Sequence, residues 1–196
     1  IRFLDYRAIN HADAIILVDE SRREQIKQAK PRIVYIIYNT PNDISSTIKS
    51  FSSSPQGSIR LAYVGVLQKE RGLLEVLDVM KKHPNWALDM AGFGGDENEI
   101  RDICKDLPNI HWHGRISYEK TLELSSAADM LFATYDPAIP NHRYSSPNKI
   151  FEAMMLGKPI VVAHGTNMDR IISSHDCGVV VTYGNQVELE ESLLQL

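Results

Sequence analysis

Cysteine is scarce in this chain of 196 residues, which contains only Cys104 and Cys177. Neither belongs to a C-x-x-C pair or to a Cys/His cluster, so the pattern does not indicate a zinc site. Two free thiols suit a reducing compartment, although two cysteines can also form one disulfide. We interpret them as small core or surface residues.

Long apolar runs are also missing, so the sequence predicts no membrane-spanning helix. The first residues, IRFLDYRAINHADAIILVDES, lack the charged leader, long apolar core and small-residue cleavage site of a signal peptide. We therefore expect a cytoplasmic protein. An initiating Met is absent as well, and we expect the sequence to be an excerpt of a longer chain.

Charge of one sign is not in large excess, because the formal net charge is only -4. This mild acidity argues against nucleic acid as a partner and against a membrane surface spread over the whole chain. It leaves room for a local basic pocket that binds a phosphate. The length and the 43% hydrophobic content are sufficient for one full domain with a sizeable core.

Two common nucleotide-binding motifs are absent. No G-K-[ST] occurs, so there is no Walker A loop, and the glycine-rich turn AGFGGDENE has Glu97 where a dinucleotide fingerprint needs its third glycine. That fingerprint also belongs after the first strand of such a fold. Gly92 and Gly94 either leave room for a sugar or nucleotide, or form an ordinary turn before an acidic helix start.

From residue 59 onward, short apolar runs alternate with longer amphipathic stretches. The predicted strands are 59–66, 86–92, 109–114, 130–135, 159–165 and 179–184, and the predicted helices are 72–84, 97–107, 118–129, 147–157, 167–178 and a final one from 185. Continuous apolar strands are typical of a parallel sheet covered on both faces. The sequence thus predicts an α/β fold with a doubly wound, Rossmann-like sheet, whose ligands bind at the carboxyl ends of the strands.

The first part of the chain differs in pattern. Strands are predicted at 12–19 and 32–39 with a helix between them, but forty residues are too few for an independent domain. We expect residues 1–41 to be the tail of a preceding domain, 42–58 to be a Ser-rich linker, and 59–196 to be the main domain.

The turn YVGVLQKERG after the first strand of the main domain combines small and basic residues. Gly65 ends the strand, and Lys69 and Arg71 precede the next helix. Glycine lets a backbone approach a ligand, and cations at a helix N-terminus suit a pyrophosphate. The alternative is an ordinary charged loop, with Glu70 balancing one cation.

The turn HGRIS after the third strand places Arg115 and Ile116 where an edge could contact a base. His111 and His113 alternate on the strand before it. Without a third ligand nearby, they do not indicate a metal site.

The long loop YDPAIPNHRYSSPNK is stiffened by two prolines and carries Asn141, His142 and Arg143. Long ordered loops at this edge of a sheet are often functional, and the alternative is a solvated surface loop.

The stretch SSPNKIFEAMMLGKP predicts a helix with Ser146 as its cap, Pro147 first and Lys149 third. A cation there opposes the helix dipole unless an anion binds. A phosphate would explain Lys149, and Glu152, one turn further, could accept hydrogen bonds from a ribose diol. The alternative is a surface Lys149–Glu152 pair.

These motifs resemble those of a known family. PNKIFEAMMLGKPIV is similar to the signature helix of the retaining GT-B glycosyltransferases of family 4, also called group 1, and YVGVLQKERG is similar to their phosphate-binding turn. ADAIILVDES and IVYIIYNTPND resemble the end of that family's N-terminal domain and the connection to its C-terminal domain. The resemblance implies a C-terminal, donor-binding GT-B domain preceded by a fragment of the N-terminal one.

The resemblance also implies roles for single residues. Lys69 and Arg71 would hold the pyrophosphate and stabilise the leaving group, and Glu152 would bind the ribose. Further donor-binding positions would be Gly65, Gly92, Gly94, Arg115, Ile116, Tyr144, Ser146, Pro147, Asn148 and Lys149.

The sequence departs from the family pattern at two positions. Val66 stands where the family often has Arg, and Tyr144 stands where it has the first Glu of E-x7-E. The contact to the donor sugar is therefore open, with Asn141, His142 or Ser145 as substitutes.

The implied activity is transfer of a sugar from a UDP- or GDP-sugar, without a metal or other cofactor, to a saccharide or lipid-linked acceptor bound by the missing N-terminal domain. Cell-surface polysaccharide synthesis, and membrane contact at the inner face through the missing part, follow from the same resemblance. We expect the fragment alone to be inactive. The alternatives are a GT-B sugar-nucleotide epimerase or phosphorylase, and a non-catalytic nucleotide-binding module.

Overall fold

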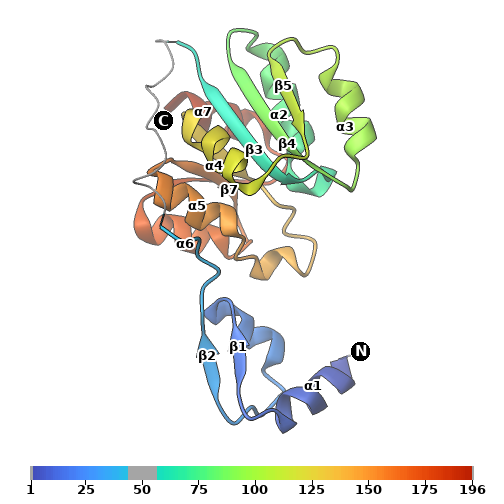
Figure 1. The fold of residues 1–196 in the computed structure, drawn as a ribbon, viewed down its shortest axis with the longest axis vertical. Coiled ribbons are helices and arrows are strands. Elements are labelled where there is room, and N and C mark those ends of the chain that lie inside the picture. Colours follow the sequence, from blue (N-terminus) through green and yellow to red (C-terminus); the bar gives the residue numbers. More distant parts are fainter. Residues whose placement is uncertain (1, 44–56, 196) are drawn as a thin grey trace.

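The computed structural model describes residues 2–43 and 57–195, and its main feature is a six-stranded parallel sheet (Figure 1). The strands are β3 (Arg60–Val66), β4 (Ala87–Phe93), β5 (Ile110–Gly114), β6 (Met130–Ala133), β7 (Ile160–Ala163) and β8 (Gly178–Val181). Their order is β5-β4-β3-β6-β7-β8, and every neighbouring pair is parallel. The doubly wound α/β fold is confirmed.

The strand order reverses between β3 and β6. The chain runs from β3 outward to β5, returns to β6 beside β3, and then runs outward to β8 on the other side. In open α/β sheets such a switch point leaves a crevice at the carboxyl ends of the two central strands. The turn after β3 and the loop after β6 therefore flank the natural ligand position.

Helices cover both faces of the sheet. One face packs against α2 (Leu73–Lys82), α3 (Glu97–Cys104) and α7 (Gln186–Gln195), and the other packs against α4 (Tyr118–Ala127), α5 (Asn148–Leu156) and α6 (Met168–His175). Consecutive strand residues therefore alternate between two buried cores. Leu61 and Tyr63 belong to the first core, whereas Ala62 belongs to the second. This double burial explains the continuous apolar strands.

The N-terminal residues form a small unit apart from the large sheet (Figure 1). It contains α1 (Arg2–His11), β1 (Ile15–Leu17), the 3₁₀ helix η1 (Glu20–Ile26) and β2 (Val34–Ile36), with β1 and β2 paired in parallel. Both strands are shorter than predicted, and the helix expected between them is a 3₁₀ helix. Most of the predicted linker, residues 44–56, lies outside the described residues.

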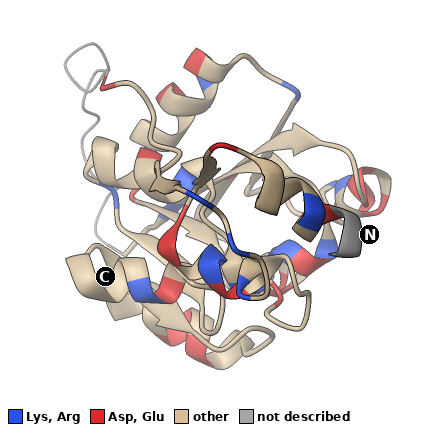
Figure 2. Ribbon diagram, turned by 90° about the horizontal axis from the view of Figure 1, so that it is seen from below, with Lys and Arg blue, Asp and Glu red and all other residues tan. Residues whose placement is uncertain are grey.

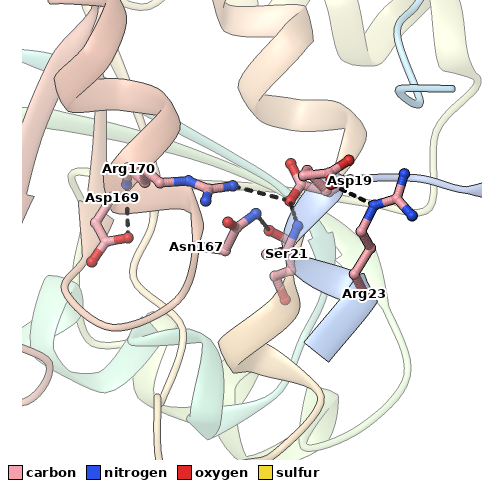
Figure 3. Close-up of polar contacts among 8 residues, drawn as sticks. Asp19, Ser21, Arg23, Asn167, Asp169 and Arg170 are labelled. Atoms are coloured by element: carbon pink, nitrogen blue, oxygen red, sulfur yellow. Dashed lines mark hydrogen bonds and ion pairs between the residues drawn. The ribbon is translucent and has the colours of Figure 1, made fainter. Parts of the chain in front are cut away.

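The N-terminal unit contacts the main domain through polar and aromatic groups. The Arg170 guanidinium on α6 lies 3.3 Å from the buried carboxylate of Asp19 (Figure 3). The same Asp19 oxygen accepts a hydrogen bond from the Ser21 backbone N–H at 2.7 Å. The rings of Tyr38 and Phe151 meet edge to face at 5.8 Å. These contacts fix the unit against α5 and α6.

The distribution of charged residues and the state of the two cysteines say little about the position of a site. Basic and acidic segments are interspersed over the ribbon (Figure 2). Both cysteines are unpaired, so a Cys104–Cys177 disulfide is absent. Within residues 2–43 and 57–195, no helix is both long and apolar enough to cross a bilayer.

Candidate functional site

The two segments at the switch point are joined through their backbones. Between them, the Asp136 N–H donates to the Glu70 carbonyl at 2.8 Å, and the Thr134 hydroxyl lies 3.5 Å from the Arg71 carbonyl. Gly72 follows with φ +70, and a Cβ there would lie only 2.0 Å from the Thr134 hydroxyl oxygen. Only glycine allows this approach, which fixes Arg71 at the crevice.

The glycine-rich turn after β4 packs against the end of β3, next to the switch point. A Cβ on Gly92 would lie 1.9 Å from the Gly65 carbonyl oxygen, so Gly92 permits close packing against the end of β3. Gly94 is exposed, and its N–H donates to the Glu97 carboxylate at 3.1 Å. The residue that breaks the dinucleotide fingerprint is therefore the one that closes this turn.

Two cations meet at the crevice on the faces of tyrosine rings. The Lys149 ammonium from α5 lies 4.0 Å from the ring centre of Tyr63 and 5.7 Å from that of Tyr135. The Arg71 guanidinium lies 3.9 Å from the ring centre of Tyr135. Gly65 gives Lys149 this room, because its Cβ would lie 3.3 Å from the ammonium nitrogen.

Several polar atoms of this cluster are buried without a partner. Among the described residues, no hydrogen-bond acceptor or donor reaches Nε of Arg71, Nζ of Lys149 or Oγ of Ser146. A buried polar group without a hydrogen bond costs about 1–3 kcal/mol, and more when it is charged. Burial first, and then the charge of Arg71, lower the pKa of Lys149 to about 7. Two cations and a hydroxyl fit an anion that has several acceptor oxygens, such as a phosphate.

The start of α5 differs from the sequence prediction. Pro147 has φ −77 and ψ 150, which is extended, so the helix begins at Asn148. Ser146 then lies one residue before the cap position and its side chain makes no capping bond, so the predicted Ser146 cap is wrong. Lys149 is the second helical residue rather than the third. Because no side chain caps this end, its first N–H groups are available to an anion.

Glu152 lies one turn further along α5. Burial raises the pKa of its carboxyl, while a hydrogen bond from the Tyr118 hydroxyl and the charge of Lys149 act in the opposite direction. A solvated Lys149–Glu152 surface pair is ruled out, since Nζ of Lys149 is buried. Glu152 is thus a half-buried acceptor beside the cationic cluster.

Comparison with protein families identifies the domain that carries this site. The model described as glycosyl transferases group 1 matches residues 44–196, most of the chain. The chain belongs to this family.

Solved structures agree with this assignment at the level of the fold. Sucrose-phosphate synthase from Thermosynechococcus elongatus has a TM-score of 0.75 and 16% identity, over 98% of this chain and 51% of that one. HepE from Anabaena, solved with UDP-glucose, has a TM-score of 0.75 and 17% identity, over 98% of this chain and 56% of that one. The pneumococcal O-GlcNAc transferase GtfA, solved with UDP and GlcNAc, has a TM-score of 0.63 and 20% identity, over 100% of this chain and 39% of that one.

The chain therefore spans about half or less of the length of these glycosyltransferase-like structures. A comparison with curated protein sequences finds no match.

Three of the residues that the family resemblance assigned to donor binding lie outside the cluster of Arg71, Lys149 and Ser146. The Lys69 ammonium is exposed, 2.8 Å from the Glu99 carboxylate on α3. Arg115, which follows β5, covers the ring of Phe93, the last residue of β4, at 4.5 Å. Ile116 lines a separate cavity of about 350 Å³ under α4. The structure brings together Arg71, Lys149 and Ser146, and leaves these three outside that group.

The loop after β6 directs Tyr144 toward the N-terminal unit. Tyr144, the last residue of the 3₁₀ helix η3 (His142–Tyr144), lines a cavity of about 480 Å³ together with Tyr6 of α1. His142 is buried instead, with Nδ1 3.0 Å from the Asp136 carbonyl and its ring 5.2 Å from that of Tyr135. His142, one of the proposed substitutes for Tyr144, therefore packs against the Tyr135 ring that also contacts Arg71.

The alternating histidines on β5, His111 and His113, contact the buried carboxylate of Asp89. Asp89 accepts hydrogen bonds from Arg60 Nε and His113 Nε2, both at 2.7 Å, and His111 Nδ1 lies 3.4 Å away. Burial opposes ionisation, but the bonds from Arg60 and His113 outweigh it and hold the pKa of Asp89 below its usual value. Within the described ranges, no group of three His, Cys, Asp or Glu residues is placed to hold a metal ion.

Three residues of the site, Tyr63, Tyr135 and Tyr118, were not predicted from the sequence. A usable signal existed for the first two, because Tyr63 lies near the end of β3 and Tyr135 follows β6, the two strands at the switch point. No spacing rule connects Tyr118 with Glu152, since α4 and α5 meet only in the folded chain.

Proposed function

We propose that this chain is the donor-binding half of a retaining glycosyltransferase that uses a nucleotide-diphosphate sugar. The observation that carries the proposal is the cluster of Arg71, Lys149 and Ser146 at the switch point, with buried donors that have no partner among the described residues. Residues 1–41 are proposed to belong to the N-terminal domain and residues 59–196 to the donor domain.

Arg71, Lys149 and the first N–H groups of α5 would bind the diphosphate. As the glycosidic bond to the donor sugar breaks, negative charge develops on the departing diphosphate, and these groups would stabilise it. Lys69 would join them after leaving Glu99, to which it is bound at 2.8 Å. That exchange costs little, since exposed ion pairs contribute about 0–1 kcal/mol.

Glu152 would accept hydrogen bonds from the ribose hydroxyls, and Arg115 with Phe93 would border the base. HepE and GtfA were solved with UDP or UDP-glucose, which favours a UDP-sugar over a GDP-sugar as donor. The acceptor, a saccharide or lipid-linked saccharide of cell-surface glycan synthesis, would bind mainly to parts of the protein outside this chain.

A thermal-shift panel tests donor binding. We expect UDP, GDP or their sugars to stabilise the chain, by about 2.7 kcal/mol at 100 times the Kd. Lys149→Ala and Glu152→Ala should lose that shift, whereas Tyr35→Ala, an exposed position on β2, should retain it. Absence of any shift with the whole panel, or full retention in both site variants, would overturn the proposal.

The reaction is tested separately. This chain alone should transfer no sugar from a labelled nucleotide sugar. Robust transfer by it would contradict the proposal that the acceptor binds mainly to parts of the protein outside this chain. With a longer protein that includes the acceptor-binding part, NMR of the product should show the anomeric configuration of the donor. An inverted configuration would refute retention, and free epimerised sugar would indicate an epimerase.

A further inference from the structure

The two cations of the crevice are held by aromatic faces. Arg71 lies 3.9 Å from the ring centre of Tyr135, and Lys149 lies 4.0 Å from that of Tyr63. Both distances are well inside the range of about 6 Å over which a ring face attracts a cation. Tyr135 is also 5.7 Å from Lys149, so it contacts both charges.

The two rings are anchored in the core. Tyr63 is buried, its hydroxyl donates to the Val66 carbonyl at 2.5 Å, and its ring packs 5.1 Å from that of Phe132. Tyr135 is buried, and His142 packs against it at 5.2 Å. The rings therefore offer fixed surfaces, and the long side chains of Arg71 and Lys149 take their positions from them.

A ring differs from a carboxylate as a partner for a cation. A carboxylate would neutralise the charge and accept the N–H bonds, so a phosphate would have to displace it. A ring face attracts the cation through its quadrupole, carries no net charge and leaves the donors free. The free donors are present here, at Nε of Arg71 and Nζ of Lys149.

We propose that Tyr63 and Tyr135 are positioning residues that hold Arg71 and Lys149 in place for the donor diphosphate without neutralising them as a carboxylate would. The inference rests on the proposed function, because it takes that diphosphate as the ligand. The tyrosines act through the two cations and need not touch the donor themselves.

This arrangement couples binding to protonation. Groups that face Lys149, directly or through one neighbour, come from every surrounding element: Arg71, Glu152, Tyr63, Tyr135, Tyr118 and His142. Burial and Arg71 lower the pKa of Lys149 to about 7, with Glu152 opposing. A bound diphosphate favours the ammonium, so above about pH 7 binding takes up a proton and affinity falls with rising pH. Replacing either tyrosine by a residue without a ring removes an interaction that stabilises the Lys149 ammonium. The pKa of Lys149 then falls further, so the decrease in affinity begins at a lower pH.

Calorimetric titration with UDP-glucose, and in parallel with GDP-mannose, between pH 6 and 9 tests the inference. The diphosphate of these sugars keeps a constant charge over that range, so the phosphates add no titration of their own. We expect Tyr63→Leu and Tyr135→Leu to bind about ten- to thirtyfold more weakly, with the fall shifted to lower pH. Tyr63→Phe, which keeps the ring face, should stay close to the unsubstituted chain, as should the surface control Tyr35→Leu. Tyr135→Phe keeps the ring face but also removes the hydroxyl that bonds to Arg71, so it serves as the reference for the ring series at that position.

A graded series guards against Leu variants that do not fold. Phenylalanine carrying an increasing number of ring fluorines at position 135 keeps the size of the ring while weakening its quadrupole. Affinity that falls stepwise with fluorination supports the inference. Affinity and pH profile that stay flat across the series, or Leu variants that match the unsubstituted chain, overturn it and leave the proposed function intact. Failure of the unsubstituted chain to bind either nucleotide sugar overturns both.

Discussion

Replacing Lys149 with methionine should make the ligand-free protein more stable while removing donor binding. Methionine fills a similar volume without placing a charge beside Arg71. Lys149 has a pKa of about 7 in the folded chain, against an ordinary value of 10.5. At about 1.36 kcal/mol per pKa unit, the buried ammonium lowers the free energy of unfolding at pH 7 by on the order of 4 kcal/mol. This is an upper limit for the gain, because some relaxation follows the substitution.

The sign of the pH dependence follows from the same values. Between about pH 7 and 10.5 the unfolded chain holds a proton on Lys149 that the folded chain has lost, so stability of the unsubstituted protein rises with pH. Urea denaturation from pH 6.5 to 9 should show this rise, with a slope approaching about 1.4 kcal/mol per pH unit. The advantage of Lys149→Met should shrink over the same range.

Two results would refute this reasoning. One is a variant less stable than the unsubstituted chain at pH 7, which would mean that the ammonium has a partner in solution. The other is a pH-independent stability difference between the two proteins. Addition of a nucleotide sugar should stabilise only the protein that retains Lys149, which separates the binding role from the stability effect.

Three further experiments test other parts of the structure. Glu152→Gln should weaken binding of UDP about tenfold but change binding of 2′,3′-dideoxy-UDP little, as measured by calorimetry, and an equal loss for both would exclude a ribose contact. Gly72→Ala should lower the free energy of unfolding by roughly 1–3 kcal/mol in urea, because its Cβ would lie 2.0 Å from the Thr134 hydroxyl at φ +70; an unchanged midpoint would contradict the close approach. Asp19→Asn should lower the melting temperature by weakening the contact with Arg170, and Arg170→Gln should then add little to that loss; additive losses would show that the two side chains act independently.

The sheet was predictable because helices cover both of its faces. Each strand alternates between two buried cores, as Leu61 and Ala62 do, so it appears as a continuous apolar run whatever its neighbours are. The turn after β3 was predictable for a similar local reason, since Gly65, Lys69 and Arg71 follow one another closely after an apolar run.

The details of the site depend on contacts between distant segments. Ser146 was predicted to cap α5 from local rules, but Pro147 is extended and moves the helix start by one residue. Glu99 on α3 forms an ion pair with Lys69 in the turn after β3, and no local sequence pattern indicates this contact. The burial of Lys149 depends on Tyr63, whose position on β3 is close to α5 only after the sheet has formed.

The backbone junction between the turn after β3 and the loop after β6 has a consequence for how this protein can change over evolutionary time. The bond from Asp136 to Glu70 joins main-chain atoms, so it survives almost any side-chain replacement. Residues 137–141 of the loop, which are exposed or half-buried, can therefore vary in size and polarity while Arg71 keeps its place at the crevice. In the proposed glycosyltransferase, such replacements would change the surroundings of the donor sugar without altering the cations that hold the diphosphate.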